Sequence, residues 1–266
     1  FEDNTHLNVS NSDVNTKKLV DPFTLSWLGI TLAEGAIAAL GGMIFKSIIE
    51  RNNGSGVDIQ DLFMQQLKFI NTIVREAITD EALRQCESQI VRINTTMTEY
   101  SNAPASSIDR LISATEAADD LWSNCKLLNH RAILPFMVVT LMKIVILQER
   151  QKRCEDLGGC SEPGEGPSIY RLCQQSIDHY NYAFQMFNNW INSRYSEVYE
   201  HEVGWYTYKF DDKVAGIWKT EQEAREDYIL KSTNLWHDLN EVMNGSAYWM
   251  REELKEIQKK YAELIH

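Results

Sequence analysis

Acidic residues beside histidines are the feature of this sequence that comes nearest to a catalytic or metal-binding pattern. A metal site needs three or four ligands that converge on one point, and acid–base catalysis needs a base within reach of a reacting group. The chain has no GxSxG, P-loop, GxGxxG or HExxH motif. We therefore expect solvated helix faces, no cofactor, no metal and no enzymatic activity. The groups considered are His201-Glu202, His237-Asp238 with Glu241, and Asp119-Asp120 with Glu116.

The five cysteines allow disulfides without fixing a pairing. Cys154, Cys160 and Cys173 bracket a Gly- and Pro-rich loop, so a bridge from Cys160 or Cys154 to Cys173 is the pairing most typical of a secreted chain. Cys86 and Cys125 fall within predicted helices and can pair only where the Cα atoms come within about 5–6 Å. The alternative is that all the thiols are free.

Four Asn-x-Ser/Thr sequons offer weak support for secretion, because glycosylation marks the secretory route. Chance alone produces nearly this many in a chain so rich in Asn, Ser and Thr. The candidate glycosylation sites are Asn8, Asn53, Asn94 and Asn244.

Charge excludes some partners. The 266 residues include 26 Lys and Arg against 38 Asp and Glu, a formal charge of −12. Nucleic acid is excluded as a partner because the chain has no basic face to displace phosphate counterions. Docking on anionic lipid at neutral pH is disfavoured as well, whereas contact with a neutral membrane is not. The 44% of hydrophobic residues suffices for one sizeable core.

The elements that must position these residues are predicted to be helices, because the chain has only five prolines and long amphipathic stretches. Residues 1–20 are polar and aperiodic, so we expect a flexible lead followed by one helical domain over 21–266. Residues 203–218 permit a short hairpin or an irregular aromatic linker. Helices are predicted at about 23–45, from 58, and at about 80–101, 106–128, 133–147, 168–201, 220–243 and 247–265.

Two of these helices are strongly apolar. Residues 23–45 contain one charge, Glu34, and are long enough to cross a bilayer, although a buried helix is the alternative. Residues 133–147 contain a single charged residue, Lys143, and are apolar on every face. Such a helix belongs at the centre of a bundle or in a membrane. We expect both of its faces to be inaccessible to solvent.

Aromatic side chains gather in the second half of the chain. Their clustering permits a lipid-interface belt, a carbohydrate platform or an ordinary core. A core is the interpretation we favour. The cluster comprises Trp190, Tyr195, Tyr199, Trp205, Tyr206, Tyr208, Phe210 and Trp218.

Over about residues 22–200, the order and spacing of four features resemble the N-terminal helical domain of the insecticidal δ-endotoxins, the crystal-toxin family. The features are the Gly-punctuated opening Leu28-Gly29-Ile30 to Gly41-Gly42-Met43, the helix start Asp58-Ile59-Gln60-Asp61-Leu62-Phe63, the apolar helix from Leu134-Pro135-Phe136 to Ile146-Leu147-Gln148-Glu149, and the run from Asp178-His179-Tyr180 to Phe187-Asn188.

The resemblance implies an all-α bundle of about seven to eight helices around an apolar fifth helix, and a secreted protein that forms pores. In the family, the fourth and fifth helices insert as a hairpin into the target membrane and the copies oligomerise. The implied partners are a target-cell membrane or a membrane receptor. The insertion candidates implied here are Leu134, Pro135, Phe136, Val138, Val139, Leu141, Met142, Lys143, Val145 and Ile146.

The turn at 128–131 would lead such a hairpin, and ionised acids on the preceding helix would resist transfer into lipid. Insertion is therefore expected to strengthen at acidic pH. The alternative function is a secreted helical interaction or structural protein that keeps this fold and never inserts.

Overall fold

A computed structural model describes residues 63–64, 67–68, 70–71, 78–102, 108–153, 164–245 and 247–265. The predicted lead, the apolar helix at 23–45, Cys154, Cys160, Asn8 and Asn53 lie outside these residues. The described part is 79% helical and 8% strand, with six α-helices. The prediction of a mainly helical fold is confirmed for this part of the chain.

The helix bounds follow the predicted ones closely, with two exceptions. The helix expected at about 133–147 continues to Lys152. The helix expected to reach about residue 201 ends at Ser193, and strand residues follow within a few positions. The helices are α5 (Asp80–Asn102), α6 (Ile108–Leu127), the 3-10 helix η1 (Asn129–Ala132), α7 (Ile133–Lys152), α8 (Gly166–Ser193), α9 (Glu221–Met243) and α10 (Ala247–Ile265).

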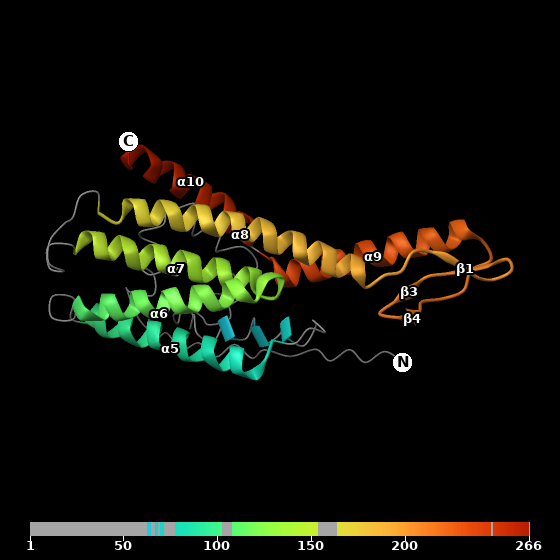
Figure 1. The fold of residues 1–266 in the computed structure, drawn as a ribbon, viewed down its shortest axis with the longest axis horizontal. Coiled ribbons are helices and arrows are strands. Elements are labelled where there is room, and N and C mark those ends of the chain that lie inside the picture. Colours follow the sequence, from blue (N-terminus) through green and yellow to red (C-terminus); the bar gives the residue numbers. More distant parts are fainter. Residues whose placement is uncertain are drawn as a thin grey trace, which may run out of the picture.

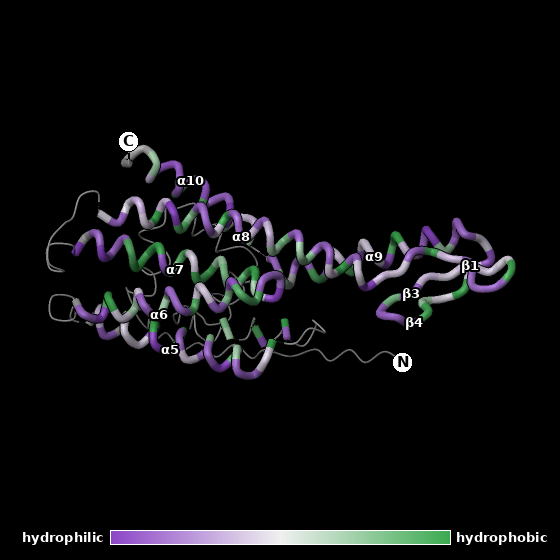
Figure 2. Tube along the Cα trace, in the orientation of Figure 1, coloured by the Kyte–Doolittle hydropathy of each residue, from purple (hydrophilic) through white to green (hydrophobic). Residues whose placement is uncertain are grey.

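Helices α5, α6, α7 and α8 lie side by side, and α10 runs along α8 (Figure 1). We call these five helices the helical body. Helix α7 packs against α6, α8 and α10. Hydrophobic residues recur along α7 until its polar C-terminal end (Figure 2). Helix α5 packs mainly against α6 and also meets the C-terminal end of α7, where the Tyr100 hydroxyl donates to Glu149 Oε1 at 2.7 Å.

The end of α8, two small hairpins and α9 extend from the helical body as an arm (Figure 1). Strand β1 (Tyr199–Glu202) pairs antiparallel with β2 (Trp205–Thr207), and β3 (Lys209–Phe210) pairs with β4 (Lys213–Val214). The two residues of the β3–β4 turn, Asp211 and Asp212, have φ of 51° and 63°. This left-handed backbone is typical of two-residue hairpin turns. The 203–218 segment is thus a hairpin region rather than an irregular linker.

The apolar helix is buried on every side, as the sequence predicts. Every residue from Ile133 to Leu147 is buried except Lys143. Phe63, Met64, Leu67 and Ile70 of the earlier helix are buried as well, in agreement with the apolar face expected there.

The structure gives no support to the predicted bridge to Cys173, whose candidate partners Cys154 and Cys160 lie outside the described residues. Cys173 is a free thiol on the buried face of α8, fully covered by the hydrophobic core. The sequence placed it beside a loop, whereas the helix already begins at Gly166 and turns Cys173 inward. Burial raises the pKa of this thiol to about 12. Cys86 and Cys125 are also free and buried, and the described residues contain no disulfide.

The two described sequons differ in accessibility. Asn94 is exposed on α5. Asn244 ends α9, is only 3% exposed, and donates from Nδ2 to Asn240 Oδ1 at 2.6 Å. A glycan is attached through this same nitrogen, so glycosylation of Asn244 would require its buried side chain to move. Glycosylation at the four sequons stays a prediction.

Replacing Leu141 with alanine is expected to lower the free energy of unfolding by about 2–5 kcal/mol, because the side chain is 4% exposed and leaves a cavity. Urea denaturation measures this change. The matched control is Leu127→Ala, at a leucine that is 74% exposed, which should shift stability by less than about 0.5 kcal/mol. Equal effects of the two substitutions would contradict the central position of α7.

Candidate functional site

The candidate site is α7 together with the turn that joins it to α6. Among the described residues, one span, Asn129–Gln151, is long and apolar enough to cross a membrane, and 83% of its most apolar stretch is buried. A buried core helix of a soluble protein passes the same test, so length and composition alone do not decide between the two. Of the ten insertion candidates, nine are buried and Lys143 is half-buried.

The turn between α6 and α7 is tightly wound. Asn129 has φ of 50°, and its side-chain amide donates to the Leu127 carbonyl at 3.3 Å. Asparagine tolerates this left-handed conformation better than most residues. His130, within the turn expected to lead the hairpin, is buried with its ring 5.7 Å from that of Trp190. Leu127 therefore marks the exposed tip.

Lys143, the one charge on the apolar stretch, is neutralised by α6. Its Nζ lies 2.6 Å from Asp119 Oδ1 and 5.0 Å from the centre of the Trp122 ring. The side chain of Lys143 is 17% exposed and that of Asp119 is 52% exposed. The sequence analysis treated Asp119 as part of a solvated face, because nothing local indicates which helix faces it. The pair joins the two halves of the α6–α7 hairpin.

A buried polar cluster ties α7 to both neighbours. Trp122 Nε1, on α6, donates to Thr140 Oγ1 at 3.1 Å and to Ser176 Oγ at 3.3 Å. The Thr140 hydroxyl, on α7, donates to the Phe136 carbonyl at 3.0 Å and lies 3.2 Å from Ser176 Oγ on α8. Buried polar groups that satisfy one another fix a unique packing. This cluster was not predicted, although Thr140 carries the only hydroxyl between Ile133 and Leu147.

His179 lies next to this cluster, one turn along α8 from Ser176. It is 8% exposed, its ring centre is 4.6 Å from that of Phe136, and its Nε2 forms no hydrogen bond with the described residues. Burial, with a smaller contribution from the positive charge of Lys126, lowers the pKa of His179 to about 4. A neutral imidazole is therefore held against α7 at neutral pH.

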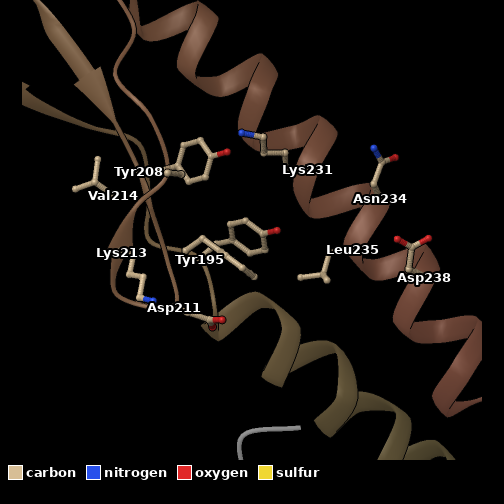
Figure 3. A pocket seen from close by; sticks show the side chains of 11 residues that line it. Tyr195, Tyr208, Asp211, Lys213, Val214, Lys231, Asn234, Leu235 and Asp238 are labelled. Atoms are coloured by element: carbon tan, nitrogen blue, oxygen red, sulfur yellow. The ribbon is translucent and has the colours of Figure 1, made fainter. Parts of the chain in front are cut away.

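A concave region lies on the arm, between the hairpins and α9. This hollow of about 530 Å³ has the rings of Tyr195 and Tyr208 on one side, facing α9 (Figure 3). Tyr208 donates to Asp227 Oδ2 at 2.7 Å. Asp211, at its edge, pairs with Arg194 at 2.7 Å. These contacts hold the arm together. Of the aromatic cluster, Tyr208 is buried, Trp205 is exposed and the other six residues are half-buried, so the preferred interpretation as a core holds for Tyr208 alone.

The acid–histidine groups do not converge. His201 and His237 are exposed at different places on the arm. Glu116 instead pairs with Arg92 at 3.2 Å, across the α5–α6 interface. No group of three potential metal ligands occurs in the described part of the chain.

Comparisons of the chain with family models, with curated proteins and with solved structures found no match. The δ-endotoxin resemblance therefore stays an expectation from the sequence, and the functional conclusion must depend on the site itself.

His179 predicts a loss of stability in acid. The folded protein keeps it neutral down to about pH 4, whereas the unfolded chain takes up its proton near 6.5. Stability is therefore unaffected by this group above the unfolded pKa and falls as pH drops from 6.5 to 4, by up to about 3 kcal/mol.

Urea denaturation between these two pH values tests this prediction. His179→Phe should lose less stability than the wild type over the same interval, and His237→Phe, at an exposed position on α9, should behave as the wild type. A His179→Phe profile parallel to the wild-type profile would contradict the assignment.

Proposed function

We propose that this protein is a secreted, pore-forming protein without enzymatic activity, in which α6 and α7 leave the fold as a hairpin and enter a membrane. The observation that carries the proposal is that α7 is apolar on every face and is covered by other helices of the same chain. The candidate span that contains this apolar stretch, Asn129–Gln151, has 23 residues, within the range of about 17–25 that crosses a bilayer's hydrocarbon core.

The proposed resting state is a bundle of about seven to eight helices around α7. Helices can store a membrane-competent segment in water when amphipathic neighbours cover it. Helix α8 fits this role, because its buried residues recur at three- and four-residue steps from Ile169 to Ile191. Helix α6 packs against α7 along the hairpin and would travel with α7.

The Lys143–Asp119 ion pair supports the choice of hairpin. A lone charge at the bilayer centre costs about 2.5–3.5 kcal/mol on insertion scales. Because both partners belong to the α6–α7 hairpin, the pair can enter the membrane without separating. Asp109, Glu116 and Asp120 of α6 are exposed and would need to be protonated or face a wet lumen.

Acid helps this transfer in two ways. Protonation neutralises the carboxylates of α6, and a charged His179 destabilises the contact between α8 and Phe136 of α7. The proposed partners are a target-cell membrane, with or without a membrane receptor, and further copies of the chain in the bilayer. Neutral lipid fits better than anionic lipid, because the protein carries a net charge of −12.

A staple between α7 and α8 tests the proposal. Thr140→Cys with Ser176→Cys replaces two hydroxyls 3.2 Å apart with thiols that can be oxidised to a disulfide. The staple is placed in a Cys125→Ala background, so that Cys125 cannot pair with another thiol. We expect the oxidised variant to release no dye from phosphatidylcholine vesicles at acidic pH, and release to return on reduction.

The matched control is Thr140→Cys alone in the same background, which should release dye regardless of reductant. Full release from the oxidised, stapled variant would reject the hairpin mechanism. Absence of release from every unstapled variant, at any pH, would reject pore formation.

The arm favours a second candidate function, a secreted helical interaction protein that never inserts. Large apolar side chains are exposed there, including Val203, which is 96% exposed, and Ile229 and Leu230 at 60% each. Exposed apolar groups of this size mark interaction surfaces when they cluster. The vesicle experiment separates the two functions, because only the first requires α7 to move.

A further inference from the structure

Cys86 of α5 and Cys125 of α6 meet in the interior of the helical body. Both residues are fully buried, and each thiol is a hydrogen-bond partner of the other. The sequence alone left open whether the two could approach, because that depends on how α5 and α6 align.

The alignment of α5 and α6 is fixed by side chains at several levels. Starting from the loop end, Arg110 pairs with Glu99 at 2.9 Å, Arg92 bonds to Ser113 at 2.9 Å, and Asn124 donates to Gln89 at 2.9 Å. The residue numbers of the paired side chains rise along α6 as they fall along α5, as expected for antiparallel helices. One turn closer to the N-terminus of α5 than Gln89, Cys86 lies opposite Cys125.

We propose that Cys86 and Cys125 form a disulfide that ties α5 to α6 when the protein meets a disulfide oxidant, such as oxidised glutathione or a thiol oxidoreductase. The Cys86 thiolate attacks one sulfur of the oxidant and expels a thiolate. Cys125 then loses its proton and attacks the mixed disulfide at the Cys86 sulfur, which expels the second thiolate. Two protons and two electrons leave the pair, and the oxidant is reduced to two thiols.

The two cysteines are suited to different steps. The hydrogen bond from Cys125 lowers the pKa of Cys86, which favours Cys86 as the attacking thiolate. Burial raises the pKa of Cys125, which suits the thiol that stays protonated until the second step. Because both sulfurs are covered in the folded protein, we expect the bond to form during folding or on local opening of α5.

The bond has a consequence that rests on the proposed function. Helix α6 is one half of the hairpin that must leave the fold, and α5 is not part of that hairpin. A covalent link from α5 to α6 would therefore hold the hairpin in the helical body. Reduction would release it, so the pair would act as a redox clamp on insertion.

Peptide mapping tests the bond directly. The full chain is refolded with oxidised glutathione, alkylated and digested with trypsin without reductant. We expect peptide 85–92 linked to peptide 111–126, lighter by two hydrogen atoms than the two free peptides together, and separated by reductant. The oxidised chain should also unfold at higher urea concentration than the reduced chain.

The linked peptide should be absent from Cys86→Ala and from Cys125→Ala, and present in Cys173→Ala, which removes a buried thiol on α8. Recovery of both wild-type peptides with alkylated cysteines would overturn the proposal. A link from Cys86 to any other cysteine would overturn it equally.

Dye release from phosphatidylcholine vesicles at acidic pH separates the clamp from the proposed function. Release by the crosslinked protein only after reduction, with Cys125→Ala releasing dye in both states, supports the clamp. Crosslinking with equal release in both states overturns the clamp and keeps the proposed function. Crosslinking with no release in either state, and none from Cys125→Ala, overturns the proposed function and leaves the disulfide standing.

Discussion

A helix that is apolar on every face must be covered on every face, and this requirement shapes the described part of the protein. Helix α7 has no solvent side between Ile133 and Leu147 apart from the position of Lys143. Its cover comes from α6, α8 and α10, each of which turns apolar residues toward it. Removing that cover in water would expose a continuous apolar surface, whereas removing it in a bilayer would not. The same constraint therefore explains the stability of the fold and its proposed release.

The few polar groups on α7 decide how firmly it is held. Thr140 bonds with Trp122 and Ser176, and Lys143 pairs with Asp119. Buried hydrogen bonds of this kind add little net stability. Removing one partner, however, leaves the other buried without a hydrogen bond, which costs free energy. Contacts to α6 can persist in a moving hairpin, whereas contacts to α8 must break. His179 sits beside the α8 contact, so protonation acts on the side that has to open.

The sequence was sufficient to predict features that depend on local periodicity. It was insufficient to predict which residues of different helices come into contact. The bounds of α5, α6, α9 and α10 and the burial of α7 follow from apolar spacing and caps such as Thr220, whose hydroxyl accepts from the Glu223 amide. Asp119 is exposed, as expected of a solvated face, but its pairing with Lys143 of another helix was not predictable from the sequence. Cys173 was assigned to a bridge because its position on the buried face of α8 is a tertiary property. The contact of Cys86 with Cys125 required the alignment of two helices.

Amide hydrogen exchange along α7 tests the central claim most directly. Protection of residues 133–147, corrected for the intrinsic rate at each pH, is compared with that of α5, at neutral and acidic pH and with phosphatidylcholine vesicles. We expect acid to lower the protection of α7 and α8 near His179 before that of α5, and vesicles to restore protection in the α6–α7 hairpin but not in α8. Protection of α7 that stays the highest in the chain at both pH values and is unchanged by vesicles would contradict the account.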